Sequence, residues 1–182
     1  MPATACPLLT PDKGALSRAG LRHHLRAVRR SDEAGLRDMF LRCSAEDMRL
    51  RCFGASKSFP QVFAARLARL SGPEDFAIVA VLENGEIGGV VHAVGVPGGE
   101  ADYDIMVRSD LKGQGLGTRL MREMLAEAGR SGFRAVHGDV LLGNRPMLLL
   151  AGDLGFRRVA LESGVVRIRA TPAAEGGHLA AA

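Results

Sequence analysis

The sequence predicts a single α/β (α+β) domain in which one mixed, mostly antiparallel sheet is flanked by helices. Three features support this class. Apolar residues recur at helical spacing between residues 31 and 70. Strand-like apolar runs separated by turn signals then occupy residues 76–107. A glycine-rich turn follows and leads directly into an amphipathic helix. The length of 182 residues suits one domain.

The first 70 residues are expected to hold an arm, one strand and three helices. Residues 1–20 show no periodicity and contain several prolines, so we expect a flexible N-terminal arm. Residues 21–28 alternate as a first strand would. Helix start signals and apolar spacing then predict three helices, which begin near residues 31, 44 and 60.

From residue 76 onward the pattern predicts a hairpin and then alternating elements. The turn 83–86, Glu-Asn-Gly-Glu, separates two strand-like runs and is a strong hairpin signal. The later elements are expected to be a strand, a helix, a strand, a helix and a final hairpin, at residues 101–107, 116–131, 135–142, 144–154 and 157–169. We therefore place the domain at residues 21–170 and expect residues 171–182, rich in Ala and Gly, to form a disordered tail.

Composition narrows the class of protein. A hydrophobic fraction of 47% and a charged fraction of 24% are those of an ordinary globular domain, and no apolar run approaches the ~20 residues of a membrane span. Three cysteines show no metal-ligand spacing, which favours a reducing cytoplasm and no metal. The net charge of +4 does not indicate a nucleic-acid partner, because no aromatic residues are interleaved with the arginines of residues 22–30.

The glycine-rich turn is the most informative segment of the chain. Gly113, Gly115 and Gly117 alternate, so the main chain can approach a bulky ligand closely with its N–H groups directed at it. The helix that follows leaves its first N–H groups unpaired and carries partial positive charge there. Together these features predict a pyrophosphate cradle. Its residues are Lys112, Gly113, Gln114, Gly115, Leu116, Gly117 and Thr118.

The order of the residues decides which phosphate ligand this turn resembles. A P-loop would place its lysine after the glycines, whereas Lys112 precedes them. A dinucleotide fold would place the turn in an early βαβ unit, but several strand-like segments come first. The turn resembles the coenzyme A loop of the GNAT superfamily of N-acetyltransferases, written Arg/Gln-x-x-Gly-x-Gly/Ala. Lys112 departs from the first position and loses the planar guanidinium fork.

A second segment agrees with this resemblance. Residues 144–147, Asn-Arg-Pro-Met, cap a short apolar helix that ends before Gly155 and Phe156. An ordinary capped core helix would explain the segment by itself. In GNAT proteins an Asn followed about eleven residues later by Gly-Phe marks the second cofactor segment, which implies roles for Asn144 and Met147. Residues 44–54 and 144–147 further resemble bacterial Pat-type protein lysine acetyltransferases.

The GNAT resemblance spans about residues 21–169 and implies a splayed sheet that binds acetyl-CoA. It implies that main-chain N–H groups at Ile105 and Val107 meet the thioester and pantetheine. Asp102 and Asp104 lie on one strand face and are the candidate general bases. We favour Asp102, because Pat-type enzymes carry Glu in an Ala-Glu-Phe segment that aligns with residues 101–103.

Other candidate residues are given smaller roles. Many GNAT enzymes place a tyrosine, a candidate general acid, where this chain has Ala151. The strand residues His92 and His137 are interpreted as packing residues rather than proton-transfer groups.

The sequence thus predicts an acetyl-CoA-dependent N-acetyltransferase. The favoured acceptor is a protein lysine side chain, and transfer is expected to be direct, with a carboxylate as general base. Two alternatives stay open. One is a small-molecule amine acetyltransferase, and the other is a non-catalytic acyl-CoA-binding sensor module. Neither a membrane nor a nucleic acid is expected as a partner, and the protein is expected to be a monomer or a homodimer.

Overall fold

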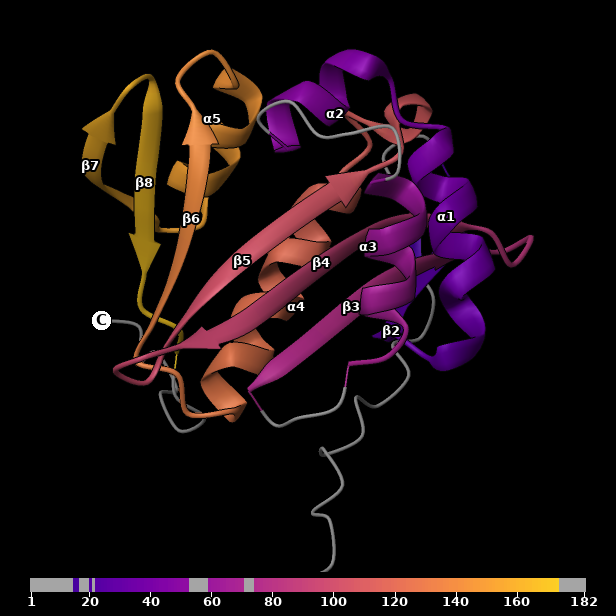
Figure 1. The fold of residues 1–182 in the computed structure, drawn as a ribbon, viewed down its shortest axis with the longest axis horizontal. Coiled ribbons are helices and arrows are strands. Elements are labelled where there is room, and N and C mark those ends of the chain that lie inside the picture. The colour runs from indigo at the N-terminus through magenta and orange to yellow at the C-terminus, as the bar shows by residue number, and fades with distance from the viewer. Residues whose placement is uncertain (1–14, 17–19, 21, 53–58, 71–73, 174–182) are drawn as a thin grey trace, which may run out of the picture.

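The computed structural model describes residues 15–16, 20, 22–52, 59–70 and 74–173. Its centre is one eight-stranded sheet in the order β1-β2-β3-β4-β5-β6-β8-β7 (Figure 1). The strands are β1 (Ala15–Leu16), β2 (Arg22–Ala27), β3 (Asp75–Leu82), β4 (Ile87–Val96), β5 (Glu100–Val107), β6 (Ala135–Leu141), β7 (Arg157–Glu162) and β8 (Val165–Ala170). All neighbouring strands run antiparallel except β5 and β6.

One face of the sheet is covered by α1 (Glu33–Leu41) and α3 (Phe59–Leu67), with α2 (Ala45–Cys52) at the end where β5 finishes (Figure 1). A short 3₁₀ helix, η1 (Arg30–Asp32), precedes α1. The apolar side of α1 is fully buried, because Leu36, Met39 and Phe40 follow the helical period and meet β3 and β4. These contacts form the smaller of two core clusters.

The other face is covered by α4 (Leu116–Arg130), with α5 (Arg145–Asp153) beside the β6–β8–β7 end of the sheet (Figure 1). Leu116, Leu120, Met121 and Met124 form one stripe of α4 and are each at most 1% exposed. Gly88 and Gly89 of β4 make this packing possible, because a side chain at either position would press on Leu111, Leu116 or Leu120.

The sheet splits between β5 and β6. β4 and β5 pair along eight positions, from Glu100 to Val107. β5 and β6 pair only at Glu100, Ala101 and Asp102 and diverge beyond that point. A gap therefore opens along the second half of β5, and the chain reaches it through η2 (Ser109–Leu111) and the glycine-rich turn.

The predicted fold is confirmed, including the mixed sheet, its flanking helices and the order of the elements. Some boundaries differ. The helical pattern extends to residue 70, but the third helix ends at Leu67. The Leu70 N–H then donates to the Leu67 carbonyl, which forms a turn. Ala15 and Leu16, within the predicted arm, pair with β2, while residues 1–14 lie outside the described part. Pro172, at the start of the predicted tail, is buried, and residues 174–182 also lie outside the described part.

Candidate functional site

The glycine-rich turn forms the N-terminal cap of α4. Gly113 and Gly115 adopt left-handed φ angles of 72° and 90°, which disfavour any side chain. Apart from the adjacent residues of the chain, no atom of the described part lies within 4 Å of the position that a Cβ would take at either residue, so both face open space. Gly115 is the N-cap and supplies no capping side chain. The first N–H groups of α4 are thus oriented toward this space, which suits an anionic ligand.

A buried arginine supports the turn from behind. Arg108 is 5% exposed and donates to the Asp110 carboxylate at 2.7 Å and to Glu86 at 2.8 Å. Glu86, at the β3–β4 turn, also accepts from Arg42 of the segment after α1. Hydrogen bonds from Arg108, then Asn84 and Arg42, lower the pKa of Glu86 to about 2. This network connects the hairpin to the turn that precedes α4.

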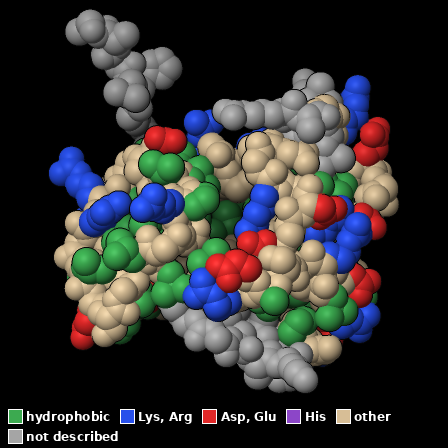
Figure 2. Space-filling view, turned by 90° about the horizontal axis from the view of Figure 1, so that it is seen from above, with side chains coloured by type: hydrophobic (Ala, Val, Ile, Leu, Met, Phe, Trp, Pro, Cys, Tyr) green, Lys and Arg blue, Asp and Glu red, His purple; other side chains and the backbone are tan. Residues whose placement is uncertain are grey.

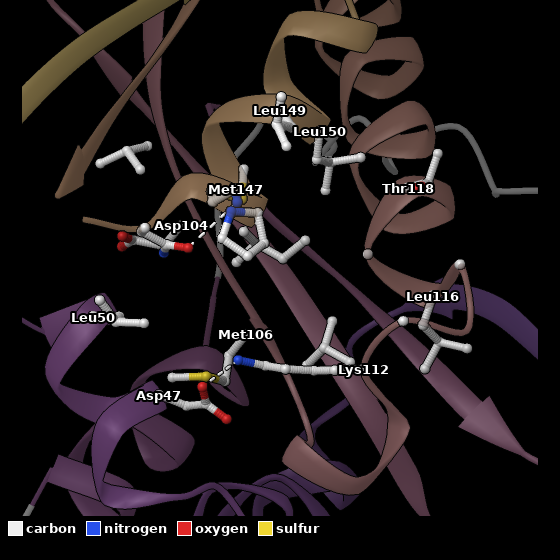
Figure 3. Close-up of a pocket in the computed structure, with 18 of the residues that line it drawn as sticks. Asp47, Leu50, Asp104, Met106, Lys112, Leu116, Thr118, Met147, Leu149 and Leu150 are labelled. Atoms are coloured by element: carbon white, nitrogen blue, oxygen red, sulfur yellow. Dashed lines mark hydrogen bonds and ion pairs between the residues drawn. The ribbon is translucent and has the colours of Figure 1, made fainter. Parts of the chain in front are cut away.

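On its open side the turn contacts α2. The Lys112 ammonium forms an ion pair with Asp47 (Figure 3), and the Ser109 hydroxyl donates to the same carboxylate at 2.5 Å. Burial opposes ionisation of Asp47, but the hydrogen bonds from Lys112 and Ser109 outweigh it and lower the pKa. The Lys112 charge, predicted for the ligand, is therefore shared with Asp47. The Gln114 amide donates to the Asp110 carbonyl at 3.4 Å.

The opposite wall is the start of α5. Asn144 caps this helix, because its side-chain oxygen accepts from the Met147 N–H at 3.3 Å. Pro146 fits the first turn, where no main-chain N–H is needed. Asn144 also borders the open space between α5 and β5. The capping role is confirmed, and the place of Asn144 on the cavity wall is compatible with its predicted role toward a ligand.

These walls enclose a cavity of about 480 Å³ at the gap between β5 and β6 (Figures 2 and 3). In Figure 2 it is the hollow between the α5 side, at the left, and the α2 side. Eleven of the predicted site residues line it, namely Asp104, Ile105, Val107, Lys112, Gly113, Gly115, Leu116, Gly117, Thr118, Asn144 and Met147. Two others, Asp102 and Gln114, are not among the lining residues.

The main chain of β5 also faces the gap. The Arg108 N–H donates to the Gly88 carbonyl of β4 at 2.9 Å. Along a strand, the main-chain N–H groups of successive residues point to alternate sides. The N–H of Met106, like that of Arg108, is therefore directed to β4, whereas the N–H groups of Ile105 and Val107 are directed to the opposite edge of β5. That edge is where β6 has diverged. These two N–H groups therefore point at the cavity, as an oxygen-binding role requires.

The two predicted carboxylates have different surroundings. Asp104 lines the cavity, whereas Asp102 accepts from Arg167 of β8 at 2.6 Å. Arg167 also bonds Asp139 of β6 at 3.0 Å, so it links β5 to β6 where they begin to separate. The sequence favoured Asp102 as the base, but the structure brings Asp104 to the cavity instead. Arg167 is distant in sequence, and no local signal indicated this pairing.

Three further carboxylates line the cavity, Asp47, Asp139 and Asp153, and Lys112 is the one lysine among the described lining residues. Sequence reasoning missed all three, because each belongs to a different segment and forms no local motif. Tyr103 also lines the cavity, and its ring lies against Gly138 and Phe156. Burial, together with Asp104 and Asp139, raises the pKa of Tyr103, so its hydroxyl stays protonated.

Within the described residues, no group of three or more His, Cys, Asp or Glu side chains is arranged to hold a metal ion. In the same part of the chain, no helix combines the length and the apolar character needed to cross a membrane.

Comparisons with known proteins agree with this geometry. The profile of the Acetyltransferase (GNAT) family matches residues 42–156. An acetyltransferase of Pseudomonas aeruginosa is 29% identical over 136 residues, which are 72% of this chain and 73% of that protein.

Solved structures show the same fold at lower identity. The GNAT domain of S. lividans PAT has a TM-score of 0.77 and 22% identity, covering 87% of this chain and 95% of that one. Spermidine N-acetyltransferase from Vibrio cholerae, in complex with CoA and spermine, has a TM-score of 0.66 and 15% identity, covering 82% and 95%.

Proposed function

Because the chain belongs to the GNAT family of acetyltransferases, which use acetyl-CoA, we propose that its acceptor is a lysine side chain of a protein. The observation that carries the proposal is the acidic lining of the cavity. Asp47, Asp104, Asp139 and Asp153 line the space next to the glycine-rich turn. Asp47 is ion-paired with Lys112 and Asp139 with Arg167, so Asp104 and Asp153 carry most of the argument. Carboxylates on the walls of a cleft raise the local concentration of a cationic amine. A protonated lysine side chain is such an amine.

The mouth of the cavity favours a protein acceptor over a small one. Leu149 of α5 lines the cavity and is nevertheless 71% exposed. A lysine ammonium on its four-carbon stem can enter the cavity while the surface around it meets this apolar rim. The likeness of residues 44–54 and 144–147 to Pat-type segments supports the same acceptor.

We assign the coenzyme to the turn and the gap. Its pyrophosphate fits Gly113, Gly115 and the start of α4, where both glycines leave open space for close approach. Its pantetheine fits the cavity between the β5 edge and Asn144. Bound there, acetyl-CoA supplies an acetyl thioester, and the N–H groups of Ile105 and Val107 are placed to donate to its carbonyl oxygen.

The base that we propose is Asp104. Its carboxylate lines the cavity, where it takes a proton from the incoming ammonium and leaves a neutral amine that attacks the thioester carbonyl. The C–N bond forms, the C–S bond breaks, and the second amine proton leaves with the coenzyme A thiol. This replaces the preference for Asp102, whose Oδ1 is held by Arg167. Tyr103, with its hydroxyl kept protonated, remains a hydrogen-bond donor beside the same space.

A panel of acceptors with isotopically labelled acetyl-CoA tests the proposal. It should contain a blocked lysine peptide, the same peptide with arginine in place of lysine, a folded lysine-rich protein, and spermidine. We expect label in the lysine peptide and the protein and none in the arginine peptide. Label in spermidine alone would favour a small-molecule acetyltransferase. Binding of acetyl-CoA without transfer to any amine would favour the sensor module.

A further inference from the structure

A buried histidine lies behind the carboxylate face of β5. His92 of β4 is 2% exposed, and its Nε2 lies 2.5 Å from Oδ1 of Asp75, the first residue of β3. From α3, Phe63 presents its ring edge to the imidazole, with centroids 6.3 Å apart. Asp75 itself is 30% exposed in its side chain, so this pair connects the protein interior with solvent.

The second ring nitrogen of His92 has no hydrogen-bond partner among the described residues. Its Nδ1 is buried, although buried polar atoms are nearly always paired. The Asp75 carboxylate can only accept, so Nε2 carries the hydrogen of that bond. In the neutral imidazole, Nδ1 then holds an unshared lone pair and is ready to receive a proton.

The sheet register places Asp104 directly opposite His92. The two residues are Cα partners of the β4–β5 ladder and project on the same face, which puts their Cβ atoms about 5 Å apart. Asp102 is the diagonal neighbour on β5, and its Oδ1 is held by Arg167. The order across three adjacent strands is thus Asp104 at the cavity, His92 in the middle and Asp75 toward solvent.

We propose that Asp104, His92 and Asp75 form a proton-transfer path from the cavity to the start of β3. The path rests on the proposed function, in which Asp104 takes the proton of the acceptor ammonium. Asp104 passes that proton, through one water or by turning its side chain, to Nδ1 of His92. The Nε2 proton of the same ring moves to Asp75, which releases it to solvent. The ring resets after the product has left: Nδ1 gives its proton back through Asp104 to water in the open cavity, and Nε2 takes a proton from solvent through Asp75.

The chain contains a matched histidine that is not on such a path. His137 of β6 is the register partner of Asp102, its Nε2 lies 2.9 Å from Glu100, and its Nδ1 is also buried without a partner among the described residues. Neither His137 nor Asp102 lines the cavity. His137 therefore reproduces the bonding of His92 without a connection to the acceptor.

The kinetic test compares His92→Gln with His137→Gln. Glutamine can keep the bond to the carboxylate but cannot take up a proton. We expect His92→Gln to lower the single-turnover transfer rate about 10- to 100-fold near pH 7, with recovery at high pH, where the amine is already neutral. His137→Gln should stay within about twofold. Equal pH–rate profiles for His92→Gln and the wild type would overturn the path. Asp75→Asn gives the same test if His92→Gln does not fold.

A second measurement does not depend on activity. Imidazole ¹⁵N spectra of the full chain report which nitrogen of His92 carries the hydrogen. We expect the hydrogen on Nε2, and an altered His92 titration in Asp104→Asn but not in Asp102→Asn. A hydrogen on Nδ1, or the same titration in both variants, would overturn the path. If no amine were acetylated but these spectra were as expected, the acceptor proposal would fail while the Asp104–His92 coupling stood.

Discussion

The two sides of the cavity use different parts of the chain. On the side that we propose for the coenzyme, residues 113–117 present main-chain N–H groups on open backbone. On the side that we propose for the acceptor, Asp47, Asp104 and Asp139 present side-chain oxygens from three separate elements. Binding by main-chain N–H groups depends on the backbone conformation of the turn. The chemistry of side-chain carboxylates depends instead on which groups they contact. Substitutions should therefore affect binding on one side and turnover on the other.

The largest expected effect on binding is at the glycine-rich turn. Gly115→Glu introduces a left-handed non-glycine residue and a negative charge beside the phosphates. At an effective dielectric of 20, one like-charge pair at 4 Å costs about 4 kcal/mol, so we expect acetyl-CoA affinity to fall by at least ~100-fold. Isothermal titration calorimetry measures the change.

The control for this prediction is Gly132→Glu. Gly132 has a φ of 79° and equally open surroundings, but it lies at the other end of α4. It introduces the same backbone strain and charge away from the cavity, so binding should be unchanged. Similar losses of affinity in both variants would mean that strain, rather than the cradle, is responsible.

On the acceptor side the expected effect is on turnover. Asp104→Asn should lower the single-turnover rate by roughly 10²- to 10⁴-fold, since it removes the proposed base, and acetyl-CoA affinity should hardly change. Asp102→Asn should cost much less, because that residue does not line the cavity. The loss in Asp104→Asn should shrink as pH rises and the amine becomes neutral. Full activity in both variants would eliminate both β5 carboxylates as the base.

The two sides also differ in how far sequence reasoning reaches. The turn at 112–118 and the Asn144 cap were predicted because each is a contiguous motif whose conformation follows from its own residues. Asp47 was missed, because its partner Lys112 is 65 residues away. The choice between Asp102 and Asp104 depends on Arg167, and that contact exists only once β8 pairs with β6. The roles of the carboxylates on the proposed acceptor side are therefore set by contacts between residues far apart in the sequence, which local patterns do not reveal.

A smaller effect is expected where the two sides meet, at the Lys112–Asp47 ion pair. Lys112→Ala should weaken acetyl-CoA binding by about tenfold or less, because one charge-assisted contact is lost. Asp47→Asn should act in the opposite direction and tighten binding by a few-fold, since it releases the ammonium toward the phosphates. Isothermal titration calorimetry of both variants measures whether acetyl-CoA affinity falls or rises. Weaker binding in Asp47→Asn would show that α2 orders the turn rather than competing for Lys112.

The smallest expected effect concerns the network behind the turn, and it appears in acid. The folded-state pKa of Glu86 is about 2, below its ordinary 4.5, so the folded protein holds this proton less tightly than the unfolded chain. The stabilisation is present above pH 4.5 and is lost as pH falls from about 4.5 toward 2. Because Glu86 is solvent-exposed, the change should be small.

The variant Glu86→Gln tests this pH dependence, because it removes the titrating carboxylate and should make the free energy of unfolding change less between pH 4.5 and pH 2. Thermal unfolding of both proteins between pH 6 and pH 3 should show the wild type losing more stability than the variant.

Glu46→Gln is the matched control. The Glu46 carboxylate is also paired with an arginine and also has a lowered pKa, but its partner Arg49 lies on the same helix, α2, and this pair is not part of the Arg108 network. At neutral pH, Glu86→Gln should also weaken acetyl-CoA binding slightly, because Arg108 then supports the turn through Asp110 alone. If Glu46→Gln weakened binding equally, the effect would be one of net charge, and the Arg108 network would have no part in holding the cradle.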